Sequence, residues 1–119
     1  MKIGILVYQN CSLWNATGMM ELLLRANKAQ DYFFPKRNHE IVFELSFIGV
    51  AKDITTYYSY PLHFKELITD NSKYNLIIIP GFDDDPRLII QNNKDAIHWI
   101  LKQYNDGCKL VSTCTGAVL

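Results

Sequence analysis

The chain has 119 residues, 49% of them hydrophobic, and its 12 Lys and Arg residues balance 12 Asp and Glu residues. This length fits one domain, or part of one, with a hydrophobic core. Because the net charge is zero, we expect no DNA contact from these residues. The sequence also lacks a secretion signal and an apolar run long enough to cross a membrane, which predicts a cytoplasmic protein with no membrane partner.

The three cysteines favour a reducing compartment. Cys11, Cys108 and Cys114 are odd in number and include no C-x-x-C pair. They therefore predict neither a disulfide framework nor a zinc site. No metal and no cofactor is predicted for the chain.

In the first half of the chain, two predicted strands flank a predicted helix. Residues 2–8 form a continuous apolar run, typical of a strand covered on both faces in a parallel sheet. Apolar residues then recur at helical spacing, namely Ala16, Met19, Met20, Leu23 and Leu24. Residues 31–39 contain Pro35 and several charges and predict a loop, whereas residues 41–48 partly alternate and predict the second strand.

The middle of the chain has a weaker pattern. Residues 52–61 are rich in Thr and Tyr, which favours short extended pieces. Phe64, Leu67 and Ile68 indicate a brief helical turn after them.

The second half repeats the order of strand, helix and strand. Residues 76–80 predict a wholly buried strand, and residues 81–86 predict a loop at its carboxyl end. A second set of apolar residues has helical spacing, namely Ile97, Ile100, Leu101 and Tyr104. Gly107 is the expected cap of this helix, and residues 109–112 predict the next strand. This alternation predicts an α/β fold: a flavodoxin-like, doubly wound, mostly parallel sheet with helices on both faces.

The strongest functional signal is the turn around Cys114, where a predicted strand runs into small residues and the start of a helix. Such a turn can hold a reactive side chain above the sheet and direct backbone N–H groups at an anion. A thiol at a helix N-terminus is also stabilised as the nucleophilic thiolate. The alternative is a small buried hydrophobe, but the neighbours Thr113, Thr115 and Gly116 favour a functional turn.

Other polar residues carry weaker signals. Gly81 follows a buried strand and allows backbone N–H groups to approach a ligand, although Pro-Gly is more often a plain turn. Asp83, Asp84 and Asp85 lack the fixed offsets of a metal site, so we interpret them as a solvated loop that caps the next helix.

The histidines and the exposed aromatic residues give no motif of their own. His39, His63 and His98 have no pattern that connects them to Cys114, so they are predicted to be surface or filler residues. Some aromatic residues either line a pocket or pack in a core or an interface, namely Trp14, Tyr57, Tyr58 and Tyr60.

Three segments together resemble the ThiJ/PfpI superfamily of class I glutamine-amidotransferase-like domains. They are residues 8–21 after the first strand, residues 79–81, and residues 111–117 around Cys114. Within that superfamily, the sequence is most similar to the sensor domains at the N-termini of AraC-type transcriptional regulators. The resemblance covers nearly the whole chain, so residues 1–119 are expected to form the N-terminal part of one such domain.

The resemblance implies roles for individual residues. Cys114 takes the position of the elbow nucleophile, and the oxyanion-hole amides come from Gly81, Phe82 and Thr115. Asn15 stands where the family usually has an acidic residue that hydrogen-bonds the cysteine, and an amide cannot exchange a proton at neutral pH. Phe82 stands where enzyme members commonly have a second glycine, so it narrows the pocket or redirects the loop.

Two further residues are expected at the pocket. Glu21 matches a glutamate often seen in regulator-like members and is predicted to face the pocket, with Trp14 beside it. The histidine of the hydrolytic members is expected beyond Leu119.

The resemblance and these substitutions imply a ligand-sensing domain of an AraC-type regulator, which binds a small-molecule effector without turnover and forms a homodimer. DNA binding is then expected only from a region beyond Leu119. The alternative is a cysteine-dependent hydrolase or hydratase, such as an amidase, a peptidase or an isonitrile-hydratase-like enzyme, with Cys114 as nucleophile and a small-molecule substrate. A third hypothesis is an oxidative-stress sensor based on the same thiol.

The end of the sequence carries its own expectation. Residues 115–119 make little more than one helical turn, which is too short to be stable alone. We therefore expect the fold to be truncated after the nucleophile elbow, within a longer protein.

Overall fold

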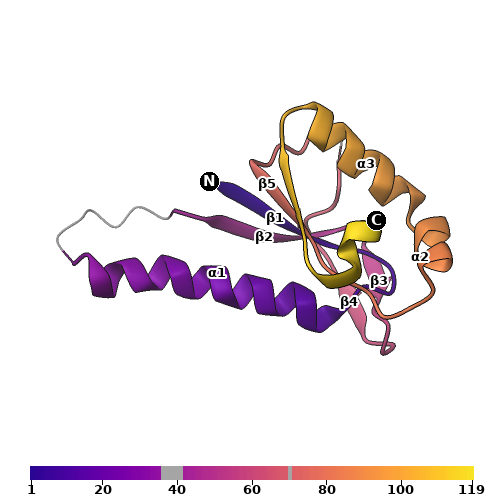
Figure 1. Ribbon diagram of the computed structural model, residues 1–119, viewed down its shortest axis with the longest axis horizontal. Coiled ribbons are helices and arrows are strands. Elements are labelled where there is room, and N and C mark those ends of the chain that lie inside the picture. The colour runs from indigo at the N-terminus through magenta and orange to yellow at the C-terminus, as the bar shows by residue number, and fades with distance from the viewer. Residues whose placement is uncertain (36–41, 70) are drawn as a thin grey trace.

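The computed structural model describes residues 1–35, 42–69 and 71–119. His39 and the predicted start of the second strand at Ile41 lie outside these residues. Four parallel strands form the central sheet, in the order β2-β1-β5-β6 (Figure 1). They are β1 (Lys2–Val7), β2 (Glu44–Gly49), β5 (Leu76–Ile79) and β6 (Lys109–Ser112). Each of these strands is predicted by the sequence.

Helices cover both faces of the sheet, as expected for a doubly wound fold. They are α1 (Leu13–Phe33), α2 (Pro86–Asn92) and α3 (Lys94–Asn105). The crossover through α1 leads from β1 to one edge of the sheet, and the crossover through α2 and α3 leads from β5 to the other. Because both crossovers are right-handed, they place α1 and α3 on opposite faces, as Figure 1 shows. Among the described residues, no helix has the length and apolar character needed to span a bilayer.

The sheet forms the centre of the hydrophobic core. The continuous apolar runs that predict the strands are buried, and the fully buried strand residues include Ile5, Leu6, Ile48 and Ile77. From α3, the residues Ala96, Trp99 and Ile100 are buried against this layer. By contrast, Ala16 is the one buried residue among the described side chains of α1, and Met19, Met20 and Leu23 are only partly buried.

A two-stranded hairpin lies beside the first βα turn. It consists of β3 (Asp53–Thr55) and β4 (Pro61–His63), which confirms the short extended pieces predicted there. The Asn10 N–H donates to the Thr55 carbonyl oxygen at 3.0 Å, and the Thr55 N–H donates to the Gln9 Oε1 at 3.2 Å. These bonds hold the hairpin at the carboxyl edge of the sheet.

Three local predictions are corrected by the structure. The predicted helical turn over residues 64–68 is wrong, because Leu67 forms a parallel bridge with Gly49 and extends the sheet locally. The predicted loop from residue 31 is wrong at its start, because α1 continues to Phe33. The residues after Cys114 form a short 3-10 helix, η1 (Cys114–Val118), in place of the start of an α-helix.

Candidate functional site

The topology places the candidate site at the carboxyl ends of β1, β5 and β6. The chain leaves β1 toward one edge of the sheet and leaves β5 toward the other, so the gap between these two strands is the topological switch point. Open α/β sheets bind their ligands at this position. The first βα turn, the loop after β5 and the turn after β6 meet there.

The turn after β6 holds Cys114 in a strained conformation. The Thr113 N–H continues the sheet by donating to the Ile79 carbonyl oxygen at 3.0 Å. At the next residue, Cys114, φ is +52°, in the left-handed region that costs free energy for a residue other than glycine. The Cys114 side chain is exposed. Strain that presents one reactive side chain to solvent is typical of a functional turn.

Two glycines allow this turn to lie directly on the end of β5. A Cβ at position 81 would lie 2.9 Å from the Cys114 Cβ and 3.2 Å from the Thr113 carbonyl oxygen. A Cβ at position 116 would lie 2.6 Å from the Pro80 carbonyl oxygen. A side chain at Gly81 or Gly116 would therefore push the elbow off the sheet.

The predicted oxyanion amides differ in their availability. The Phe82 N–H donates to the Thr115 hydroxyl at 2.8 Å, and that hydroxyl donates to the Phe82 carbonyl oxygen at 2.6 Å. The Phe82 amide would bind an anion only if the Thr115 hydroxyl turned away. The Thr115 N–H itself has no acceptor among the described residues. The Phe82 ring is buried and its backbone pairs with Cys11, so the ring lies in the core and not across the elbow.

The first βα turn lies against the same loop. The Ser12 N–H donates to the Gly81 carbonyl oxygen at 2.8 Å, and the Asn15 Nδ2 donates to the Ser12 Oγ at 3.0 Å. Within the described part of the chain, no side-chain hydrogen bond or ion pair engages the Cys114 thiol. The structure therefore brings Cys114, Gly81 and Thr115 into contact, whereas the Asn15 amide is occupied by Ser12.

Tyr8 is a part of the site that the sequence prediction missed. Its hydroxyl is buried beneath the elbow and donates to the Pro80 carbonyl oxygen at 2.5 Å. Burial raises the pKa of the Tyr8 hydroxyl, and the negative charges of ionised Cys11 and Cys114 raise it further. The phenol thus stays protonated next to the cysteine turn. The available signal was its position at the carboxyl end of the predicted strand over residues 2–8.

The other two cysteines are protected from solvent by burial. Burial raises the pKa of the Cys11 thiol to about 11 and also raises the pKa of the Cys108 thiol. Both side chains are buried, whereas Cys114 is exposed. Cys114 is therefore the accessible thiol of the three.

Glu21 and Trp14 lie on the outside of α1. Glu21 forms an ion pair with Arg25 one helical turn away, and both side chains face solvent. Trp14 is also exposed. The structure does not bring Glu21 to the elbow, because its helical position turns it away from the sheet.

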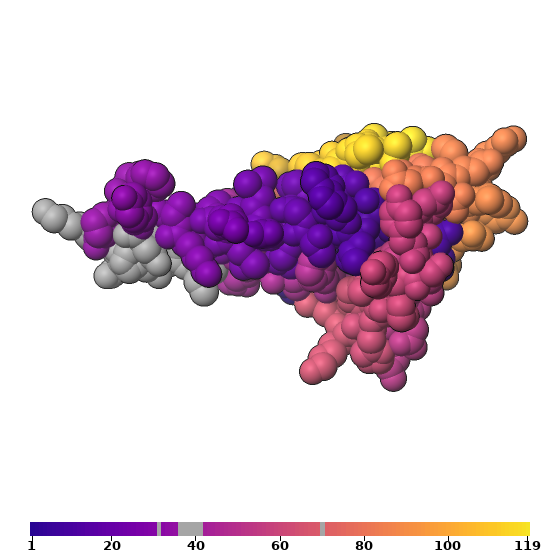
Figure 2. All heavy atoms as spheres, turned by 90° about the horizontal axis from the view of Figure 1, so that it is seen from below, coloured from indigo at the N-terminus to yellow at the C-terminus, as the bar shows by residue number. Residues whose placement is uncertain are grey.

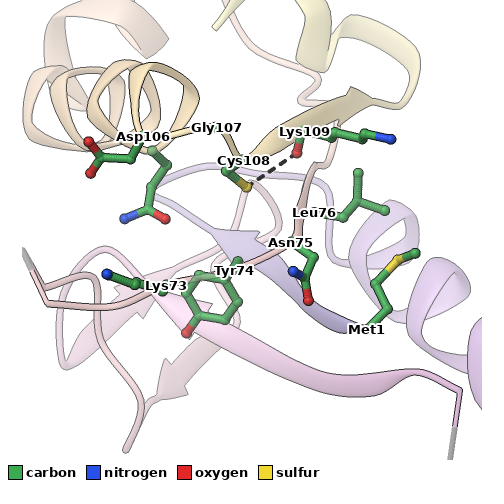
Figure 3. Close-up of a pocket in the computed structure, with 10 residues that line it drawn as sticks. Met1, Lys73, Tyr74, Asn75, Leu76, Asp106, Gly107, Cys108 and Lys109 are labelled. Carbon is green, nitrogen blue, oxygen red and sulfur yellow. Dashed lines mark hydrogen bonds between the residues drawn. The ribbon is translucent and has the colours of Figure 1, made fainter.

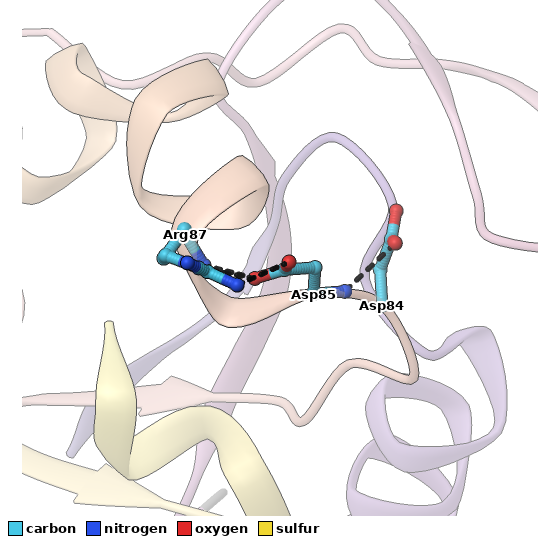
Figure 4. Close-up of polar contacts among 3 residues, drawn as sticks. All are labelled: Asp84, Asp85 and Arg87. Carbon is cyan, nitrogen blue, oxygen red and sulfur yellow. Dashed lines mark hydrogen bonds and ion pairs between the residues drawn. The ribbon is translucent and has the colours of Figure 1, made fainter.

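The acidic loop after β5 caps α2, as the sequence predicts. The Asp85 carboxylate accepts a hydrogen bond from the Arg87 N–H at 2.9 Å, and its second oxygen lies 3.4 Å from the Arg87 guanidinium (Figure 4). The Asp84 carboxylate accepts from the Asn10 Nδ2 at 3.0 Å, which joins this loop to the first βα turn. The aspartates therefore fix the loops at the rim of the site.

A spacious cavity lies at the opposite end of the sheet from the elbow. Its volume is about 920 Å³, and it lies at the amino ends of the strands, between Tyr74, Asn75, Cys108 and Lys109 (Figure 3). A smaller groove of about 430 Å³ lies behind the elbow, between α3 and η1, where Ile100, Tyr104, Leu110 and Leu119 give it an apolar lining.

The chain therefore has a doubly wound α/β fold with a strained cysteine at its switch point. No family model matches the chain, and no curated protein matches it in sequence. In structure, the chain is similar to an AraC family transcriptional regulator from Pseudomonas putida (14% identity, TM-score 0.72, 98% of this chain and 57% of that chain). It is also similar to oxidized DJ-1 from Toxoplasma gondii (15% identity, TM-score 0.67, 99% of this chain and 58% of that chain). A DJ-1 superfamily protein from Salmonella typhimurium is similar as well (12% identity, TM-score 0.65, 98% of this chain and 57% of that chain).

These likenesses establish the fold. The chain has the flavodoxin-like fold of the DJ-1/ThiJ/PfpI superfamily, which confirms the predicted resemblance at that level. The chain spans less than three fifths of each of these three proteins.

Proposed function

We propose that the chain is the ligand-sensing domain of an AraC-type transcriptional regulator, and that it binds a small molecule at the Cys114 elbow without turnover. The observation that carries this proposal is that Asn15, at the position where the family usually has an acidic residue, forms no hydrogen bond with the thiol. Asn15 donates its amide to Ser12, and no side chain of the described residues forms a hydrogen bond with the Cys114 thiol. A cysteine nucleophile normally has a partner that takes its proton and returns it later.

The elbow retains features suited to binding. The Cys114 thiol is exposed, and the Thr115 N–H is free to meet a polar group of the ligand. Gly81 lets the backbone approach closely, and the Phe82 amide is already satisfied by Thr115. We expect a ligand that is held by contacts with the turn and is released chemically unchanged.

The similarity to the AraC family regulator from Pseudomonas putida supports this role. We propose that DNA is bound by a region beyond Leu119, since residues 1–119 have no net charge. We further propose that the regulator works in the cytoplasm as a homodimer, with the small-molecule effector as its regulatory partner.

The test combines ligand binding with chemical analysis of the bound compound. Metabolite mixtures would be screened for compounds that raise the melting temperature of the protein and protect Cys114 from iodoacetamide. A compound found in this way is expected to bind to Cys114→Ala within about tenfold of the wild-type affinity, because the turn backbone remains. Cys108→Ala, a change at the other end of the sheet, should bind as the wild type does.

Mass spectrometry of the recovered compound decides between binding and turnover. An unchanged compound supports the sensor. Conversion that requires Cys114 would contradict it.

The rival function is a cysteine-dependent hydrolase or hydratase, and one observation favours it. The strained φ of Cys114 and the close contact of the turn with Gly81 are typical of a nucleophile elbow. In that case the thiol attacks an electrophilic carbon, and the Thr115 N–H stabilises the developing negative charge.

Iodoacetamide tests the rival directly. An enzyme predicts rapid labelling of Cys114 at pH 6–7. A labelling rate no higher than that of an ordinary exposed thiol, whose pKa is about 8.5, would count against an activated nucleophile.

A further inference from the structure

The cavity at the amino ends of the strands takes no part in the function proposed for the elbow. Its volume of about 920 Å³ lies within the range of small-molecule sites. Figure 3 shows it between the carboxyl end of α3 and the chain segments that enter β5 and β6. The helix α1 covers the other face of the sheet (Figure 2, indigo and purple), and none of its described residues lines the cavity. Access for a ligand therefore does not depend on α1.

One wall of the cavity is apolar. It consists of the Tyr74 ring and the side chains of Met1, Leu76 and Cys108. Trp99 holds the Tyr74 ring from one side in an edge-on contact, with 6.1 Å between the ring centroids. Ligand sites commonly combine such a fixed apolar wall with a few polar groups that orient the ligand. This wall therefore suits the flat or aliphatic body of an organic molecule.

Two amide side chains supply unpaired polar groups. Gln103 is only 3% exposed, and its Nε2 donates to the Ser72 carbonyl oxygen at 2.7 Å. Its Oε1 has no hydrogen-bond partner among the described residues. The Asn75 Oδ1 accepts from the Lys2 N–H at 2.7 Å, so the Asn75 Nδ2 is left without an acceptor in the described part of the chain. The cavity thus offers one acceptor and one donor to a ligand.

The charges around the cavity favour an anion. Lys73 and Lys109 line it and are exposed, and neither ammonium group forms an ion pair with a described carboxylate. Both flank the free Asn75 amide, because Lys73 precedes Asn75 by two residues and the Lys109 N–H donates to the Asn75 carbonyl oxygen at 3.0 Å. Asp106, the acidic residue of the lining, is paired with Lys102 at 3.1 Å. Ammonium and amide donors in such a group are suited to a carboxylate or a sulfonate.

We propose that this cavity is a second small-molecule site, which binds an organic anion with an apolar body, such as an aromatic carboxylate or sulfonate. The body of the ligand lies against the apolar wall. The anionic group is bound by the Asn75 Nδ2 and by the ammonium groups of Lys73 and Lys109. The site and the Cys114 elbow are at opposite ends of the sheet, so the inference does not depend on the function proposed for the elbow.

Two fluorescent probes with the same ring system test the site on the protein. Anilinonaphthalene sulfonate carries an anion, and phenylnaphthylamine lacks it. We expect a saturable rise in fluorescence with the sulfonate, and binding at least about tenfold tighter than that of the neutral probe, because charge-assisted hydrogen bonds form only with the sulfonate. Equal or weaker binding of the sulfonate would show that apolar surface alone takes up the probes, which would overturn the proposal.

Asn75→Asp tests the anion contact with an isosteric change. Aspartate keeps the oxygen that accepts from the Lys2 N–H, but it replaces the Nδ2 donor with a carboxylate oxygen. The variant is expected to bind the sulfonate at least about tenfold more weakly, and the neutral probe within about twofold of the wild type. Asn92→Asp, at an exposed asparagine of α2 near the other end of the sheet, is the matched control and should bind both probes as the wild type does.

Lys109→Gln gives the same test without altering the bond to Lys2. The exposed glutamine retains a donor but loses the charge, so we expect about fivefold weaker binding of the sulfonate. An undiminished affinity for the sulfonate in both Asn75→Asp and Lys109→Gln would contradict the proposal.

The labelling rate of Cys114 shows at which end of the sheet the probe binds. Saturating anilinonaphthalene sulfonate should leave the rate of iodoacetamide labelling within about twofold of its value without the probe, because the two sites are far apart along the strands. Protection of Cys114 would place the probe at the elbow and overturn the second site. None of these results bears on turnover at Cys114, which is measured separately.

Discussion

Cys114 and Cys108 lie at opposite ends of the sheet, and their surroundings differ. At the carboxyl edge, Cys114 is exposed on a strained backbone that is packed tightly against Gly81. At the amino edge, Cys108 is buried beside a cavity of about 920 Å³. The spacious end thus lacks an accessible thiol, and the end with the accessible thiol is closely packed.

The difference follows from how each end is built. At the carboxyl edge, three turns converge: the Ser12 N–H of the first turn donates to the Gly81 carbonyl oxygen of the second, and the Thr113 N–H ties the third turn to the end of β5 at Ile79. At the amino edge, the cavity lies where the chain enters β5 and leaves α3, and the backbone bonds there, such as the Asn75 N–H to the Lys2 carbonyl oxygen, join neighbouring strand ends. The strained, exposed cysteine packed against glycine therefore marks the candidate site better than cavity volume does.

The largest predicted effect concerns glycines at the two edges. Gly116→Ala would push a methyl group into the carbonyl oxygens of Ile79 and Pro80, so we expect a loss of about 3 kcal/mol or more in the free energy of unfolding. Gly107 at the amino edge has open space around it but a φ of +94°, so Gly107→Ala should cost only about 1 kcal/mol. Urea unfolding of both variants measures the two values.

If Gly116→Ala and Gly107→Ala lost equal free energy of unfolding, the two edges of the sheet would not differ in how tightly they are packed. Gly18→Ala controls for alanine itself, because Gly18 lies in a helix with open space around it. The free energy of unfolding of that variant is expected to rise by about 0.5–1 kcal/mol, because alanine has a higher helix propensity than glycine.

Continuous apolar runs and small residues made much of this fold predictable from the sequence. The runs that became β1 and β5 have no polar alternation, so they had to be buried on both faces. The position of Cys114 directly after a strand placed it at the carboxyl edge, because all strands of a parallel sheet end there. Gly81 reaches the same edge for the same reason.

The remaining features depend on contacts that the sequence pattern does not encode. α2 has only seven residues, too few to show a helical period, although Asp85 and Pro86 mark its start. Leu67 is extended because it forms a bridge with Gly49, although its spacing from neighbouring apolar residues predicts a helical turn. Glu21 was placed by resemblance, whereas the rotation of α1 on the sheet decides where its side chain points. Such rotations are set by packing over the whole helix.

The next predicted effect concerns pH and the buried thiols. Burial raises the pKa of Cys11 to about 11, so the folded state favours the neutral thiol. The resulting stability is complete below the unfolded pKa of about 8.5 and is lost as the pH rises toward 11. The free energy of unfolding of the wild type should therefore fall as the pH rises from about 8 to about 10.5. We expect it to fall by about 2 kcal/mol less in Cys11→Ala, which lacks this thiol, since one pKa unit corresponds to about 1.4 kcal/mol.

The matched variant lies at the other edge. Cys108 also has a raised pKa, but it borders the cavity, so Cys108→Ala should remove a smaller part of the pH dependence. Thermal unfolding at both pH values gives the comparison. A larger effect at Cys108 than at Cys11 would show that the amino edge is the more tightly sealed end.

The smallest predicted effect separates two hydroxyls within the elbow. The Thr113 Oγ1 is buried and has no hydrogen-bond partner among the described residues, whereas the Thr115 hydroxyl both accepts from and donates to Phe82. An unpaired buried hydroxyl destabilises the fold, so Thr113→Val should raise the free energy of unfolding by about 1 kcal/mol. Thr115→Val should lower it by about 1–2 kcal/mol, because it leaves the Phe82 amide unpaired. If Thr113→Val were instead destabilising, its hydroxyl would have a partner in solution. A drop in ligand affinity without a loss of stability would identify that hydroxyl as part of the binding surface of the elbow.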